Sequence, residues 1–247
     1  VVVMLWCICG QRYSFLEIGI RTCPEFECNT SVFNKTFKIN TFVPKKTEEK
    51  GYFRGVDMHN MKIVFLILLR GIAQVMLQNN ALTGLLFLFG IFYNSWSLGM
   101  AAILGNLTST LTACFFKYQK NDLENGIFGF NGTLVGIAVC FYFGFTGITI
   151  LSLVIGAMFS SVLMNFLKKH IPAYTSPFIL ITWLFLLILP ILHWASFVKY
   201  PVEPQNTVDF LSLSSMGIGQ VMFQGNIVTG LVFLLGITLH SRISALY

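Results

Sequence analysis

The sequence predicts an all-α integral membrane protein: an inverted-repeat, multi-span helical bundle with tilted re-entrant helices and an incomplete second repeat. Composition supports the membrane class, because 55% of the 247 residues are hydrophobic and only 11% are charged. Soluble domains carry about 25% charged residues. The repeat rests on two near-identical stretches that lie far apart in the chain. These features exclude an ordinary soluble enzyme and a disordered chain.

Residues 1–60 differ from the rest of the chain in their mixed polarity, and we treat them as an N-terminal extension without an assigned fold. Four of the six cysteines lie there, at Cys7, Cys9, Cys23 and Cys28. Their spacing matches no strong zinc pattern, so we expect neither a metal nor another cofactor. The net charge of +6 also forms no basic stripe interleaved with aromatic residues, and we expect no nucleic-acid partner.

Apolar runs begin near Ile63, and several approach the ~20 residues that cross a bilayer as a helix. They occupy residues 63–69, 85–93, 98–116, 126–145, 147–167 and 177–197. Polar breaks fall at 117–125, 168–176 and 199–207. Four lysines lie in the first two breaks and one in the third, so the positive-inside rule predicts that the first two face the cytoplasm.

The repeat is the strongest signal in the chain. GIAQVMLQNNALTGLLFLFGI (71–91) and GIGQVMFQGNIVTGLVFLLGI (217–237) are identical at 14 of 21 positions, at an offset of 146. The identities include polar pairs that apolar composition would not align: Gln74/Gln220, Gln78/Gln224, Asn80/Asn226 and Thr83/Thr229. About five spans separate the copies, which predicts an inverted repeat with a solute site near the membrane midplane. We therefore divide the chain into a first repeat, 61–207, and the start of a second, 208–247.

The amide side chains of these stretches allow two interpretations. Gln74, Gln78, Asn79 and Asn80 stand in apolar sequence, where an unsatisfied amide costs several kcal/mol. They can join helices by hydrogen bonds. Alternatively, a tilted or re-entrant helix can line a polar path with them, and their recurrence at an inverted position favours that interpretation.

Three groups of residues resemble the urea transporter family. IPAYTSPF (171–178) is similar to its L-P-x-x-T-x-P-F signature, with Ile171 in place of Leu. RGIAQVMLQNNALTG and GIGQVMFQGNIVTG resemble its paired re-entrant helices, and NGIFGFNGTLVGIA (125–138) resembles its N-G-x-x-G-[FY]-N-G-x-L-x-G run. The resemblance covers roughly residues 62–247.

The resemblance implies passive, channel-like conduction of urea through a narrow pore in each protomer of a homotrimer, in a multi-pass protein of the plasma membrane. It implies an apolar and aromatic slot formed by Leu77, Phe130, Leu134 and Val221. By the same matching, Gln74 and Gln220 stand at the ends of ladders of oxygen acceptors, and Thr175 lies near the narrowest point. Leu77 departs from the Phe common in the family, whereas its counterpart Phe223 keeps the aromatic ring.

These residue types suit a thin, neutral, planar solute, because amide and hydroxyl oxygens can replace water around its NH2 groups. No Asp or Glu lies in 127–167 or 177–197, so no proton relay or sodium site is visible and transport should be passive. No catalytic motif is present, and we expect no enzyme; an intramembrane hydrolase is the least favoured interpretation. A channel for ammonia, water or short amides would also fit these residues, as would a non-conducting fragment of a longer transporter.

The 146-residue offset puts the counterparts of Phe130, Leu134 and Thr175 after Tyr247. Part of the second wall of the slot is therefore outside this sequence. We expect the chain on its own to conduct poorly or not at all.

Overall fold

The computed structural model describes residues 61–198 and 210–240, which are helical with short connections and include no strand. These residues belong to one compact unit, Gly51–Tyr247. The predicted N-terminal extension, its four cysteines and the polar break at 199–207 lie outside the described residues. The all-helical fold and its apolar helices agree with the predicted membrane class.

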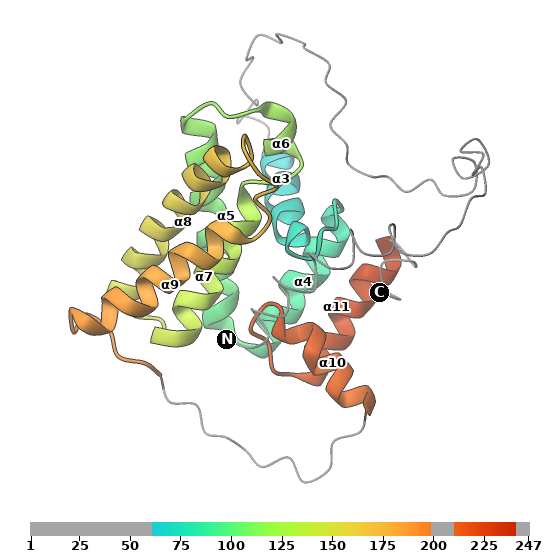
Figure 1. The fold of residues 1–247 in the computed structure, drawn as a ribbon. Helices are drawn as coiled ribbons and strands as arrows, with labels where there is room; N and C mark the ends of the chain where they lie inside the picture. Colours follow the sequence, from blue (N-terminus) through green and yellow to red (C-terminus); the bar gives the residue numbers. More distant parts are fainter. Residues whose placement is uncertain (1–60, 199–209, 241–247) are drawn as a thin grey trace, which may run out of the picture. The chain divides into compact units, whose positions relative to one another are not determined.

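Within residues 61–198, and again within 210–240, the helices follow one another with short connections (Figure 1). Their bounds are α3 Met61–Ala73, the 3-10 turn η1 Gln74–Met76, α4 Ala81–Asn94, α5 Trp96–Phe115, α6 Lys120–Glu124, α7 Gly129–Phe143, α8 Gly147–Leu167, α9 Ser176–Ile191, α10 Phe210–Gln220 and α11 Ile227–His240.

In the described part of the chain, α5 and α8, with 20 and 21 residues, are by themselves long and apolar enough to cross a membrane. The pair α3–α4, bent by 76° at its break, reaches that length only if both pieces count as one span. α7 and α9 have 15 and 16 residues, fewer than the apolar runs predicted for them. Gly126 and Gly144, with φ of 74° and 75°, turn the chain before and after α7 and so limit its length.

α7 is the most deeply buried helix, and every residue from Gly129 to Cys140 is buried. Glycines allow α5 to approach it backbone to backbone. A Cβ added at Gly105 would lie 2.1 Å from the carbonyl oxygen of Gly132, and one at Gly136 would lie 2.2 Å from that of Ala101. Small residues permit this kind of packing between membrane helices.

The two copies of the repeat meet where α4 packs against α11 (Figure 1). The Thr83 hydroxyl donates to the Gly236 carbonyl at 2.9 Å, and the hydroxyl of its counterpart, Thr229, donates to the Gly90 carbonyl at 3.1 Å. Between these bonds the equivalent rings of Phe87 and Phe233 lie 4.8 Å apart. Equivalent residues therefore exchange equivalent contacts along an antiparallel helix pair, as in an isologous interface.

Candidate functional site

The first copy contains a tight turn between α3 and α4. η1 ends at Met76, and the next residue, Leu77, has a φ of 57°, which is left-handed and unusual for a non-glycine residue. The Leu77 amide donates to the Gln74 carbonyl at 2.9 Å, and the Gln78 side chain donates from Nε2 to the Met76 carbonyl at 3.0 Å. Asn80 then caps α4 by accepting from the Leu82 amide at 2.9 Å. Local amide side chains thus support the bend.

The second copy reproduces this turn between α10 and α11. Phe223 has a φ of 60°, and the Gln224 side chain donates to the Met222 carbonyl at 2.7 Å. Asn226 accepts from the Val228 amide at 2.8 Å and so occupies the place of Asn80. The polar identities between the copies therefore maintain the backbone of the turn, a role that neither interpretation of the amide side chains had included.

A loop after α6 holds the first turn through Asn125. Gln74 donates from Nε2 to the Asn125 carbonyl at 3.0 Å, and Asn79 donates from Nδ2 to the Asn125 side-chain oxygen at the same distance. The bond at Nε2 fixes the orientation of the Gln74 carboxamide. Its Oε1 can accept a hydrogen bond and has no hydrogen-bond partner among the described residues. The site therefore offers an uncharged acceptor beside α7, against which η1 packs.

Asn131, on the first turn of α7, holds the segment 171–178. Its Nδ2 donates to the Tyr174 carbonyl at 3.2 Å, and its Oδ1 accepts from the Phe178 amide at 3.2 Å. The side chain is fully buried, where an unmet hydrogen bond is costly. This clamp sets the position of Thr175, which is half-buried and makes no capping hydrogen bond through its side chain.

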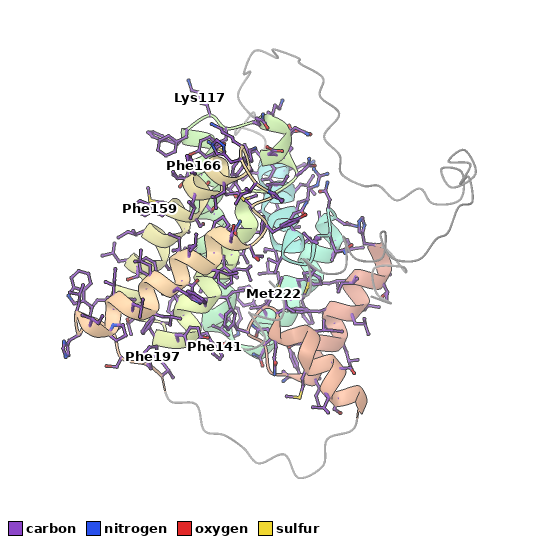
Figure 2. The ribbon with its side chains drawn as sticks, viewed as in Figure 1. Lys117, Phe141, Phe159, Phe166, Phe197 and Met222 are labelled. Carbon is purple, nitrogen blue, oxygen red and sulfur yellow. The ribbon has the colours of Figure 1, made fainter. Side chains whose placement is uncertain are left out.

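The second turn meets α7 and α9 through aromatic rings. The Phe223 ring lies 5.3 Å from that of Phe141 and 5.9 Å from that of Tyr142, and it reaches Phe178 of α9 at 6.4 Å. Figure 2 marks Phe141 and the buried Met222, which come from α7 and from the second turn. Both turns thus contact α7, the first through η1 and the second through Phe223.

Basic residues gather at the end of the bundle that holds α6. Lys168 pairs with Asp122 and lies 5.0 Å from the centre of the Phe128 ring, while Lys120 pairs with Glu124 at 3.6 Å. Tyr118 lies between α5 and α6, and burial raises the pKa of its phenol above the usual value. No group of three metal-ligating side chains is found within the described residues.

A family model described as "Urea transporter" matches residues 65–247. The chain belongs to the urea transporter family. It is 27% identical over 200 residues to "Urea transporter 1" of Rattus norvegicus, covering 73% of this chain and 52% of that protein. The protein of the same name from Mus musculus is 28% identical over 201 residues, with the same two shares. The chain therefore spans about half the length of the curated relatives it matches. The description of this family is that of a transporter and not of an enzyme.

The pore residues that the family resemblance predicts fall into two groups according to how far their side chains are exposed. Phe130 and Leu134 are buried on α7, at 6% and 3% exposure, and Gln74 is half-buried beside Asn125. Leu77 is 62% exposed at the tip of the first turn, Val221 is 36% exposed, and Gln220 is exposed at the end of α10. η1 and the 171–178 segment both contact α7, the helix that carries Phe130 and Leu134, whereas Gln220 makes no hydrogen bond through its side chain among the described residues.

Sequence reasoning missed Asn125 and Asn131 as functional candidates. Both lie in the N-G-x-x-G-[FY]-N-G run that supports the family resemblance. The available signal was an asparagine followed directly by a glycine, once just before the apolar helix and once in its first turn. The partners of Asn131, 43 and 47 residues further along the chain, could not be identified without the fold.

Proposed function

We propose that the chain supports passive, channel-like transport of urea, through a narrow slot between the two turns and α7. The observation that carries this proposal is the fixed carboxamide of Gln74. Its nitrogen is held by the Asn125 carbonyl at 3.0 Å, so its oxygen can accept a hydrogen bond from a solute N–H. The apolar wall of Phe130 and Leu134 lies on the adjacent helix α7. Family membership supports the choice of solute.

The proposed slot selects by shape and by neutral hydrogen bonding. Urea is planar and uncharged, and each of its NH2 groups needs an acceptor in place of water, a bond with a net worth of about 0.5–1.5 kcal/mol. Gln74, Gln220 and the hydroxyl of Thr175 are the proposed acceptors, and Leu77, Phe130, Leu134 and Val221 the proposed apolar lining. Ions would lose their hydration in such a slot without a comparable return, and are excluded.

The same proposal includes the arrangement in the membrane. The antiparallel pairing of α4 with α11, and the matching turns at Leu77 and Phe223, support an inverted repeat with re-entrant helices. The division into 1–60, 61–207 and 208–247, the multi-pass plasma-membrane placement and the homotrimer belong to this proposal on the strength of the family.

The direct test is uptake of labelled urea by liposomes that contain the purified chain, compared with empty liposomes. We expect a low urea uptake that is still above the empty control, with dimethylurea excluded because its methyl groups widen the plane and remove N–H donors. Ammonia or water flux without urea flux would favour a channel for those solutes. Equal urea uptake by loaded and empty liposomes would overturn the proposal for this chain.

A second candidate is a subunit that conducts only in assembly with other chains. The uncovered surface of α10 favours this role. A Cβ at Gly217 of α10 would meet no atom within 4 Å, whereas a Cβ at Gly71, its counterpart in the first copy, would lie 2.9 Å from Asn106. Urea flux that appears only when the chain is reconstituted together with a full-length relative, and that exceeds the relative's own flux, would support this role.

A further inference from the structure

Arg70 lies one helical turn before Gln74 on α3. Its Nη1 donates to the Glu124 carbonyl at 3.0 Å, and Gln74 donates to the next carbonyl, that of Asn125, at the same distance. Residues four apart on a helix are neighbours on one face, about 6 Å apart. A guanidinium and the proposed solute acceptor are therefore held side by side by consecutive carbonyls of one loop.

The positive charge of Arg70 has no acidic partner in residues 61–198 and 210–240. Those residues include only two acids, Asp122 and Glu124, and each pairs with a lysine, Lys168 and Lys120 respectively. Arg70 is half-buried, and its guanidinium places a positive charge beside the site. An ionisable residue within a membrane segment is by default a functional candidate.

The loop also holds Arg70 in place. Gly126 has a φ of 74°, and a Cβ there would lie 2.4 Å from the Gly71 backbone nitrogen and 2.7 Å from the Arg70 carbonyl carbon. The loop is thus packed directly on the backbone that carries the guanidinium. The second copy has the neutral Met216 at the corresponding position, so the charge is a feature of the first copy alone.

We propose that Arg70 is a charge-selectivity residue, which excludes cationic analogues of the solute from the Gln74 side of the slot. This inference rests on the proposed function. The informative probe is guanidinium, because it matches urea in size and planarity and carries N–H donors but adds one positive charge. Guanidinium is more weakly hydrated than a compact cation, so the loss of hydration excludes it less strictly than other ions. The field of Arg70 supplies the additional repulsion.

The experiment measures uptake of labelled guanidinium and labelled urea by liposomes that contain the chain. R70Q keeps a donor for the Glu124 carbonyl but removes the charge, and R70K keeps both. K117Q removes an exposed lysine at the end of the bundle that holds α6 and is the matched charge control (Figure 2). We expect the guanidinium-to-urea ratio to rise about 100-fold in R70Q and to stay at the unaltered value in R70K and K117Q. That change corresponds to about 2.8 kcal/mol at 1.4 kcal/mol per factor of ten, the repulsion of two unit charges ~6 Å apart at an effective dielectric constant near 20.

An unchanged ratio in R70Q, or equal changes in R70Q and R70K, would overturn the inference while leaving urea transport in place. Absence of urea flux in the unaltered chain would instead remove the proposed function, and this inference with it. If R70Q does not fold, competition on the unaltered chain decides: acetamide should slow urea uptake and guanidinium should not. Equal inhibition by the two compounds would contradict a role for the charge.

Discussion

In the first copy of the repeat the turn at Leu77 is held by polar contacts from the α6–α7 loop, whereas in the second the turn at Phe223 is held by aromatic rings of α7 and α9. Gln74 bonds to Asn125, but its counterpart Gln220 is exposed; Leu77 is 62% exposed, but Phe223 contacts three rings. The backbone of the two turns is nevertheless the same, with φ of 57° and 60°. Local sequence sets the turn, and the neighbouring helices decide which side chains are used.

The largest expected difference between the two copies is the loss of stability when a glycine of α4 or of α11 is replaced by alanine. A Cβ at Gly84 would lie 1.9 Å from the Leu69 carbonyl oxygen, and one at Gly230 would lie 1.9 Å from that of Ser215. α3 cannot shift, because α5 and α7 pack on it, whereas α10 is largely uncovered. We expect Gly84→Ala to destabilise by about 3 kcal/mol or more and Gly230→Ala by about 1 kcal/mol, in thermal unfolding in detergent.

Gly147→Ala is the matched control, because a Cβ there meets nothing within 4 Å, and we expect little change. Equal losses from Gly84→Ala and Gly230→Ala would contradict the claim that the first copy is the more rigid one.

The Asn131 clamp should be the next most sensitive feature. Asn131→Leu removes the hydrogen-bond partner of the partly buried Tyr174 carbonyl and of the buried Phe178 amide, at a cost of about 2–4 kcal/mol. Because Thr175 moves with this segment, urea flux should fall as well. Asn165→Leu, on the half-exposed face of α8, serves as control. If Asn131→Leu kept both stability and flux, the segment would be positioned by other contacts.

Truncating the tips of the two turns tests the contrast in their packing. Phe223→Ala removes ring contacts with Phe141, Tyr142 and Phe178 and should cost about 2 kcal/mol of unfolding free energy. Leu77→Ala removes an exposed side chain and should cost under about 1 kcal/mol. Denaturation in detergent would measure both, and a larger loss at Leu77 would reverse the assignment of the packed turn.

The smallest expected effect tests what the copies share. Thr83→Val and Thr229→Val each remove one of two equivalent hydrogen bonds, and each should cost about 0.6–1 kcal/mol. The two losses should agree within ~0.5 kcal/mol, because the contacts are reciprocal. A loss confined to one variant would mean that the α4–α11 pairing is not symmetric in the membrane.

The sequence was sufficient to predict an all-helical chain with apolar helices compatible with a membrane, and the run of α8, which begins and ends at the predicted residues 147 and 167. It did not predict the left-handed residue at Leu77, because a leucine carries no preference for positive φ. α9 ends at Ile191, short of the predicted 197, with Pro190 in its last turn and His193 at a φ of 55°. The apolar pattern alone does not mark such an end.

The candidate site residues were predicted one by one from the family resemblance. The hydrogen bonds that join them to other segments were not predicted. Gln74 and Asn125 are 51 residues apart, so their bond depends on how α3 packs against the α6–α7 loop. The role of the repeated Gln78 and Gln224 as local braces also could not be read from the sequence, since an amide in apolar sequence serves a helix contact or a path equally well.

The central claim is that the Gln74 oxygen accepts a hydrogen bond from urea in transit, and urea uptake by liposomes containing Gln74→Leu tests it most directly. We expect flux about tenfold below that of the unaltered chain, since a hydrogen bond worth ~1.4 kcal/mol is lost. Gln119→Leu, outside the helices, should leave flux unchanged. A properly folded Gln74→Leu chain that carries urea at the unaltered rate would contradict the account.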